Sequence, residues 1–179
     1  LAHFMEHMGF NGSKNFPKNE LEDYLQKAGV EFGADLNAYT SFDETVYILP
    51  IPTDDPEVVE KGFTVLEDWA FNNLFDKAEI EKERGVVLEE SRLSKGSFER
   101  MSRQYFPKLF NGSKYAERLP IGKDEVLKNF KHETLKNFYK NWYRPSLMAI
   151  IVVGDIDPAE AKKKIIAHFG KFKDPANAP

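Results

Sequence analysis

Two histidines and a glutamate near the start of the chain could hold and use a metal ion. His3 and His7 are four residues apart, so on a helix they lie one above the other, and Glu6 borders the same face. This H-x-x-E-H spacing is the inverse of the commoner H-E-x-x-H zinc signature. Two neutral imidazoles and a carboxylate leave one zinc position open for water, and a carboxylate that is not a ligand can take that water's proton.

The neighbours of these residues indicate that the helix is buried. Phe4, Met5 and Met8 fill the remaining positions with apolar groups. Polar side chains inside such a helix need a partner, which a metal ion would provide. The alternative interpretation is that His3 and His7 are core histidines satisfied by a neighbouring carboxylate and backbone carbonyls, with no metal.

A third ligand could come from a second, longer helix. The sequence predicts one helix over residues 76–95, with Asp76 as its N-cap. Glu83 and Glu90 are seven residues apart, about two turns, and so share a face, whereas Glu89 is rotated by about 100° and points elsewhere. Buried carboxylates need a cation, and zinc on the first helix would supply it. The alternative is an ordinary solvated face whose glutamates pair with basic neighbours.

Four segments, in order along the chain, resemble the amino-terminal domain of the pitrilysin/insulinase family of zinc peptidases, the inverzincins. They are LAHFMEHMGFNGS, LNAYTSFDETVY, IEKERGVVLEES and NWYRPSLMAIIVVGDIDP. The match runs from Leu1 to about Phe172 and is closest in character to the processing-peptidase branch. The resemblance therefore covers nearly the whole chain.

The resemblance implies a zinc ion, a general base and a supporting carboxylate. Carried over residue by residue, the zinc ligands are His3, His7 and Glu90, the catalytic base is Glu6, and Glu83 supports the site. The cofactor expected on this basis is Zn²⁺.

A hairpin is predicted from two runs of strand composition, residues 30–41 and 44–52. Within the first run, residues 37–40 are short and polar with one aromatic, which suits an edge strand able to accept another chain. In the family that the chain resembles, this strand pairs with the substrate peptide. Asn37, Ala38 and Tyr39 are therefore the substrate-binding candidates. The alternative is an interior strand without such a role.

The rest of the chain is predicted to form helices and one apolar strand. Helices are predicted over residues 20–28, 54–73, 123–130, 132–142 and 158–169, and a central strand over 146–153. Together these elements predict an α+β fold with helices packed on one face of a largely antiparallel sheet, as the resemblance also implies. His132 is interpreted as a surface residue, and His168 as a histidine favoured by the dipole at the end of its helix.

Composition excludes several classes of function. The chain has 179 residues, 41% hydrophobic and 30% charged, which suits one globular domain. A net charge of −4 argues against a nucleic-acid surface. No apolar run reaches the length of a membrane span. The absence of cysteine excludes disulfides and thiolate metal sites. The compartment stays open between the periplasm and the cytoplasm of a bacterium.

Residues 1–172 are expected to form an amino-terminal catalytic zinc-peptidase domain, and residues 173–179 to begin a linker. Because Leu1 lies directly inside the metal-motif helix, we expect an internal fragment. The resemblance implies further strands upstream and a second homologous domain or subunit completing the substrate chamber. The predicted function is a zinc metalloendopeptidase acting on peptides or unfolded segments. A non-catalytic partner subunit of the same fold and a zinc hydrolase of a small molecule are the alternatives.

Overall fold

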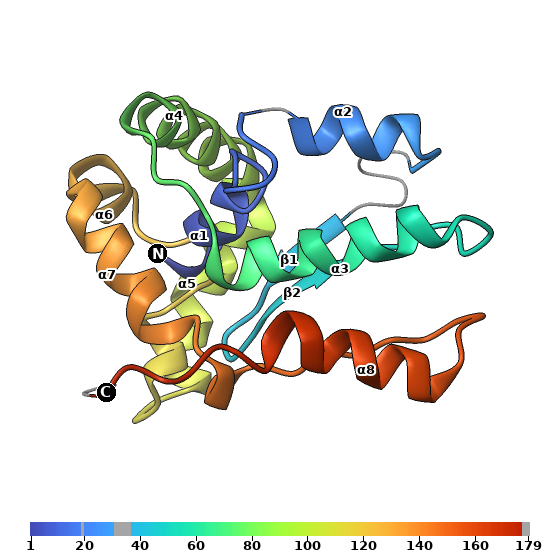
Figure 1. The fold of residues 1–179 in the computed structure, drawn as a ribbon. Helices are drawn as coiled ribbons and strands as arrows, with labels where there is room; N and C mark the ends of the chain where they lie inside the picture. Colours follow the sequence, from blue (N-terminus) through green and yellow to red (C-terminus); the bar gives the residue numbers. More distant parts are fainter. Residues whose placement is uncertain (19, 31–36, 177–179) are drawn as a thin grey trace.

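The computed structural model describes residues 1–18, 20–30 and 37–176 and has an α+β architecture, as predicted. A short antiparallel hairpin lies among helices (Figure 1). The helices are α1 (Ala2–Met8), α2 (Glu20–Lys27), α3 (Pro56–Phe71), α4 (Lys77–Ser94), α5 (Ser97–Leu109), α6 (Asp124–Asn129), α7 (His132–Trp142) and α8 (Pro158–Phe169). The strands are β1 (Asn37–Thr40) and β2 (Thr45–Ile48), and the 3-10 turns are η1 (Lys114–Ala116) and η2 (Pro145–Leu147).

The predicted hairpin is confirmed for its central part. β1 and β2 pair antiparallel, in a register that sets Asn37 opposite Ile48 and Thr40 opposite Thr45. The earlier part of the predicted first strand, residues 31–36, lies outside the described residues. In the described part of the chain the sheet contains these two strands alone, so β1 has a strand on one side only.

Helix α1 is buried, as its apolar residues predict. Phe4, Met5 and Met8 are fully buried in one core with Ile80 and Val87 of α4. A helix of seven residues has little stability of its own, so the surrounding core holds it in place. This packing fixes the first histidine-bearing turn against the helix that carries the two glutamates.

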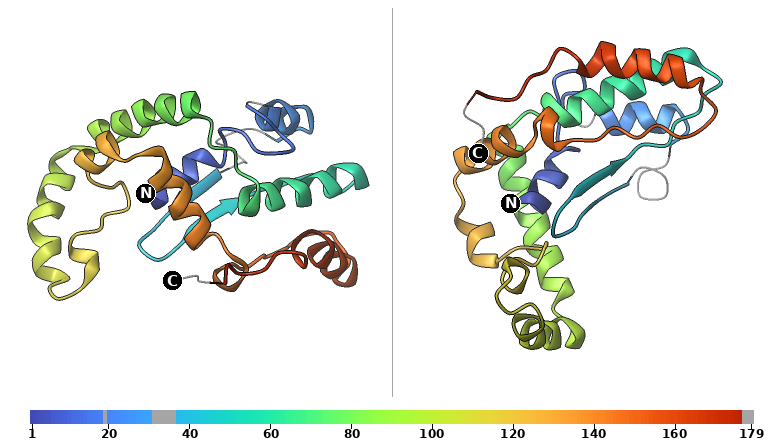
Figure 2. Two further views of the ribbon diagram at one scale, coloured as in Figure 1. Left: turned by 60° about the vertical axis from the view of Figure 1, so that its left-hand side comes forward. Right: turned by 90° about the horizontal axis from the view of Figure 1, so that it is seen from below.

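A second core lies between α3, α2 and the hairpin. The Tyr47 ring of β2 stacks on Trp69 of α3, with ring centroids 5.2 Å apart. Helix α8 lies alongside α3 on the outer side, and the views in Figure 2 agree on this arrangement. The same figure shows α4 and α5 reaching away from this layer as an arm. The candidate functional site lies where this layer meets the arm of α4 and α5.

Capping residues set several helix boundaries at the predicted positions. The Asp76 carboxylate accepts the Ala78 amide at 2.8 Å, and Asp157 accepts the Ala159 amide at 2.9 Å. Gly29 follows α2 with φ of +81°, the left-handed conformation that glycine adopts without strain. The predicted starts of α4 and α8 and the predicted stop after α2 are therefore confirmed.

The central strand predicted over residues 146–153 is wrong. The chain forms η2 and then runs through 148–153 without a ladder to any described strand. Ile151 and Val153 are 82% and 91% exposed. Apolar composition favours a strand, but a strand forms only where another strand satisfies its backbone amides and carbonyls.

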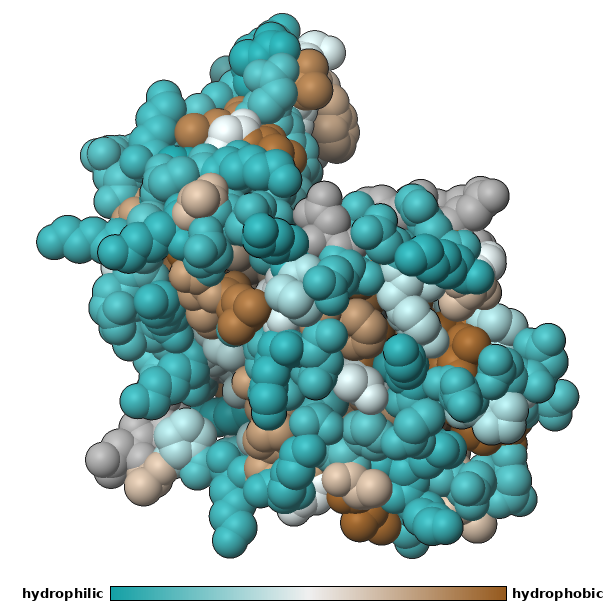
Figure 3. Space-filling view, turned by 45° about the horizontal axis from the view of Figure 1, so that its top comes forward, coloured by the Kyte–Doolittle hydropathy of each residue, from teal (hydrophilic) through white to brown (hydrophobic). Residues whose placement is uncertain are grey.

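The visible surface is mainly hydrophilic, with small apolar patches between hydrophilic residues (Figure 3). This agrees with a sequence in which 30% of residues are charged. Among the described residues, no helix is both long and apolar enough to cross a membrane.

Candidate metal centre

Three side chains from two helices converge on one point. His3 Nε2 and His7 Nε2 of α1 lie 3.3 Å apart. The Glu90 Oε2 of α4 lies 3.4 Å from His3 Nε2 and 3.3 Å from His7 Nε2. The three atoms therefore form a nearly equilateral triangle. The predicted helical spacing brings the histidines together, and the packing of α1 on α4 brings the glutamate to them.

This triangle has the dimensions of a tetrahedral zinc site. Zinc bound at about 2.0–2.2 Å by imidazole nitrogen and carboxylate oxygen separates its ligand atoms by about 3.3–3.5 Å. The set is also chemically suitable, since it contains two imidazoles and one carboxylate. Within the described part of the chain, His3, His7 and Glu90 form the one group of three or more such residues close enough to share an ion.

Glu83 orients one of the histidines. Its Oε1 lies 2.7 Å from Nδ1 of His7, and its Oε2 accepts the Asn11 side-chain amide at 2.8 Å. Asn11 also donates to the backbone carbonyl of His7 at 3.0 Å. A carboxylate on Nδ1 fixes the tautomer in which Nε2 carries a lone pair, the form required of a metal ligand.

The environment shifts the pKa of His3, His7 and Glu83. Burial lowers the pKa of His3, which favours its neutral form. Burial opposes the charged form of His7 also, but the hydrogen bond and charge of Glu83, with Glu90 and Glu6 nearby, raise its pKa. Burial alone would raise the pKa of Glu83, but the hydrogen bonds from His7 and Asn11 lower it. Glu83 therefore stays ionised beside His7.

Glu6 lies on the same helix but is held by the hairpin. It is 8% exposed, and its Oε2 accepts a hydrogen bond from the Thr40 hydroxyl at 2.5 Å. Thr40 is the last residue of β1 and lies 3.2 Å from the Thr45 hydroxyl across the strand pair. Sequence reasoning missed Thr40, although it directly follows the three substrate-binding candidates.

A cleft of about 470 Å³ opens beside these groups. Among the substrate-binding candidates, Ala38 and Tyr39 line it. Asn37 is not among the lining residues, and its side chain accepts the Ala38 amide at 2.8 Å. The remaining lining residues are His3, Glu6, His7, Thr40, Glu90, Pro120 and Ile121. The last two were not predicted, because they come from a loop after η1 whose place in the fold no local pattern indicates.

Two half-buried tyrosines link the hairpin to α1 and α7. The hydroxyls of Tyr47 and Tyr143 lie 2.9 Å apart, and Tyr47 donates to the Met5 carbonyl at 3.3 Å. Burial raises the pKa of Tyr143 to about 12. Tyr143 belongs to the NWYRP segment, to which no site role was assigned, so this link between the hairpin and α7 was also missed.

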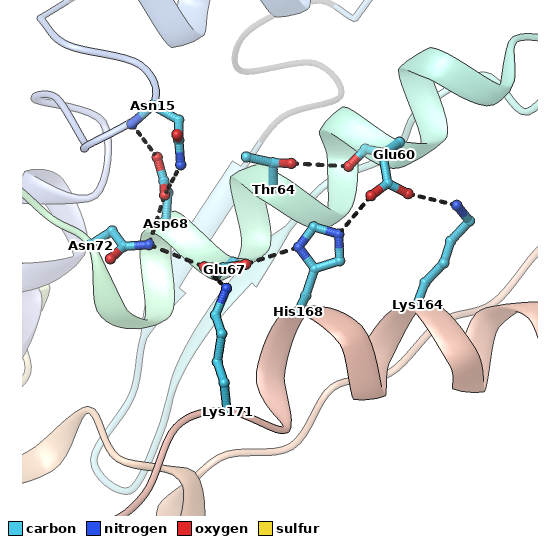
Figure 4. A network of polar contacts seen from close by, with 9 residues as sticks. All are labelled: Asn15, Glu60, Thr64, Glu67, Asp68, Asn72, Lys164, His168 and Lys171. Carbon is cyan, nitrogen blue, oxygen red and sulfur yellow. Dashed lines mark hydrogen bonds and ion pairs between the residues drawn. The ribbon is translucent and has the colours of Figure 1, made fainter.

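The other two histidines lie outside the centre. His132 pairs with Glu81 at 2.6 Å on the surface of α4, as expected of a surface histidine. His168 lies between Glu67, 2.9 Å from Nδ1, and Glu60, 3.0 Å from Nε2 (Figure 4). The helix dipole alone therefore does not explain the position of His168, because His168 also joins α8 to α3.

Comparison with known proteins identifies the family. Residues 1–109 match the family model described as Insulinase (Peptidase family M16). The chain belongs to this family. The M16 match contains all five residues of the predicted metal centre, and residues 129–179 match a second model, the Peptidase M16 inactive domain.

M16 relatives match almost the whole chain. It is 38% identical to the probable zinc protease PqqL of Escherichia coli K12 over 177 residues, covering 99% of this chain and 19% of that protein. It is 31% identical to the mitochondrial-processing peptidase subunit beta of Blastocladiella emersonii over 177 residues, covering 96% of this chain and 36% of that protein. The chain thus spans about a fifth of the length of the E. coli relative.

The fold is also that of an M16 protein. The crystal structure of the first half of the periplasmic protease PqqL from E. coli superposes with a TM-score of 0.92 at 37% identity. The match covers 99% of this chain and 38% of that one. The predicted family and the α+β fold class are confirmed.

Proposed function

We propose that this chain carries the catalytic centre of a zinc metalloendopeptidase. The observation that carries the proposal is the triangle of His3 Nε2, His7 Nε2 and Glu90 Oε2, with sides of 3.3–3.4 Å. These three residues would hold the zinc ion. When bound there, zinc would act as a Lewis acid on the scissile carbonyl and acidify a water molecule. The names of the relatives, which include zinc proteases, support the same chemistry.

The remaining residues would handle the proton and the geometry. Glu6 would take the proton of the attacking water and later pass it to the leaving amine. The hydrogen bond from the Thr40 hydroxyl holds the Glu6 carboxylate beside the cleft. Turning the carboxylate away from the cleft would break this hydrogen bond. Glu83 would keep His7 in the required tautomer, so its role is to position a ligand and not to touch the substrate.

The substrate would bind as a strand along β1. The strand has a partner, β2, on one side, and Ala38 and Tyr39 line the cleft. The Ala38 amide is satisfied by the Asn37 side chain rather than by a strand, so an incoming peptide could replace that contact. Main-chain pairing demands an extended segment, which favours peptides and unfolded regions over folded proteins. A small-molecule substrate would leave this edge unused.

The proposal includes a larger assembly. The matched relatives are much longer than this chain, and a second homologous domain or subunit would complete the substrate chamber. A non-catalytic partner subunit is the second candidate function, but such a role would not require the metal ligands and the adjacent carboxylate to converge as they do here.

The test combines metal content with peptide cleavage. Purified protein should contain one zinc per chain by elemental analysis and cleave unstructured peptides. Glu6→Gln should keep the zinc and lower kcat by about 10²- to 10⁴-fold, because only the proton acceptor is lost. Glu89→Gln is the matched control, since Glu89 neighbours Glu90 but pairs with Arg92 at 2.6 Å on the exposed side of α4. Absence of zinc binding in the unmodified protein would contradict the proposal.

A further inference from the structure

The loop between η1 and α6 forms one wall of the cleft. Pro120 and Ile121 line the cleft with the metal-ligand candidates and with Ala38 and Tyr39. Both are half-buried, so protein covers part of each side chain and the remainder faces accessible space. Neither can bind a metal or transfer a proton. Their contribution must come from shape and apolar surface.

This wall is held in a defined conformation. The Gly122 amide donates to the Leu119 carbonyl at 2.9 Å, which closes a turn around Pro120 and Ile121. Gly122 has φ of +86°, a conformation that favours glycine. Leu127, 2% exposed, lies 3.9 Å from where a side chain on Gly122 would begin. The turn therefore rests on the buried face of α6.

Helix α4 anchors α6 and also carries Glu90. Ser91, the residue after Glu90, donates to the Asp124 carboxylate at 2.7 Å at the start of α6. Arg84 donates to the carbonyls of Leu127 and Phe130, the latter at 3.1 Å. Helix α4 thus positions both the Glu90 carboxylate and the wall formed by Pro120 and Ile121. A pre-organised wall loses little entropy when a ligand packs on it.

The charges around the cleft are negative. Glu6 and Glu90 line it, and the described lining residues include no lysine or arginine. A bound zinc ion would be occupied by its ligands and the reacting group, so an acidic substrate side chain elsewhere in the cleft would meet carboxylates and apolar surface. An aliphatic or aromatic side chain would bury area against Ile121.

We propose that Pro120 and Ile121 form a specificity subsite for an apolar side chain next to the scissile bond, and that this subsite rejects acidic side chains. The inference rests on the proposed peptidase function and adds the class of substrate. A single methylene group in an apolar pocket is worth about 10- to 200-fold in kcat/KM. Peptides with leucine at a flanking position should therefore be preferred to matched peptides with glutamate by at least about tenfold.

The test uses peptides that differ only at the two positions flanking the bond that is cut, carrying leucine, glutamate or lysine. kcat/KM is measured for the unmodified protein, Ile121→Ala and Ile121→Lys. Binding of the same peptides is measured by fluorescence anisotropy in the Glu6→Gln background, so that recognition has a readout apart from cleavage. Ile121→Ala should reduce the leucine preference toward unity, and Ile121→Lys should reverse it in favour of glutamate.

Controls separate this inference from the proposed function. Ile166→Lys makes the same change on α8, where the side chain is 61% exposed, and should leave the preference unchanged. Zinc content of each variant shows whether the metal centre is intact. If the unmodified protein cleaves no peptide, the peptidase proposal is wrong, and the anisotropy ranking still decides the subsite. An unchanged ranking in both Ile121 variants would overturn the inference.

Discussion

Two regions of the molecule place histidines among glutamates, and only one has the form of a metal site. At the α1–α4 contact, two imidazole Nε2 atoms point at one oxygen of Glu90. At the α3–α8 contact, the single imidazole of His168 directs its two nitrogens at separate carboxylates, Glu60 and Glu67. In the first region three possible ligand atoms converge on one point, and in the second the two nitrogens of one ring face separate acceptors.

The counter-charges differ as well. Lys164 and Lys171 pair with Glu60 and Glu67, each at 2.6 Å, so the α3–α8 cluster is balanced by protein cations (Figure 4). Among the described residues, the ion pairs of Glu83 and Glu90 involve histidines only. The comparison teaches that a histidine beside carboxylates indicates a metal site only when its lone pair converges with others and no lysine satisfies the acids.

The largest expected effect comes from removing the shared carboxylate. Glu90→Gln should lower zinc content well below one per chain and reduce kcat/KM by roughly 10³-fold or more, since a catalytic metal supplies several kcal/mol. Glu67→Gln makes the same change in the α3–α8 cluster and should alter neither quantity. Elemental analysis and peptide cleavage measure both. Equal zinc loss in the two variants would remove the distinction drawn above.

A smaller effect is expected from the carboxylate that orients His7. Glu83→Gln keeps the shape of the side chain and weakens its charge-assisted hydrogen bond, so zinc affinity should fall by about 10- to 100-fold. Competition with a chelator of known affinity measures this change. Glu89→Gln should match the unmodified protein. If Glu83→Gln abolished binding as fully as Glu90→Gln, Glu83 would have to be assigned as a ligand.

The residues of the candidate metal centre were predictable in pairs because their spacing is local. His3 and His7 share a helix, and Glu83 and Glu90 share another, so helical periodicity alone places each pair on one face. The distance between the two helices depends on how Phe4 and Met8 pack against Ile80 and Val87, which no local pattern specifies. The sequence resemblance supplied that step.

The failures have the same physical origin. Residues 146–153 have strand composition, but pairing depends on a neighbour elsewhere in the fold. Thr40, Ile121 and Tyr143 reach the site through contacts between segments far apart in the chain, and none belongs to a spaced motif of chemically reactive residues. His168 was assigned to its own helix end, although its partners lie about a hundred residues earlier, on α3.

The α3–α8 cluster should respond to acid through stability. Lys164 and His168 lower the pKa of Glu60 through hydrogen bonds and charge. Burial would raise the pKa of Glu67, but Lys171 and His168 lower it. A carboxylate with a lowered folded-state pKa stabilises the protein above its unfolded value of about 4.3, and this contribution disappears as pH falls through the folded-state pKa.

Glu67→Gln should therefore lower Tm at pH 7, and the gap to the unmodified protein should close below about pH 4. Thermal unfolding followed by circular dichroism at a series of pH values measures the gap. Glu117 is exposed after η1, and Glu117→Gln should leave Tm unchanged at every pH in the series. A gap for Glu67→Gln that stayed constant with pH would show that the ion pairs do not carry the effect.

The smallest effect is expected where no charge is involved. Tyr143→Phe removes the hydroxyl 2.9 Å from Tyr47, and Tyr47 keeps its contact to the Met5 carbonyl. Losing one half-buried neutral hydrogen bond should lower the free energy of unfolding by about 0.5–1.5 kcal/mol. Because the pKa of Tyr143 is about 12, both hydroxyls stay protonated near neutrality, so this loss should not vary between pH 6 and pH 9. Denaturant unfolding at both pH values measures the loss, and a loss that varied with pH would contradict this account of the tyrosine pair. Zinc content should be unchanged, since the tyrosine pair supports the backbone of α1 without touching the ligand atoms.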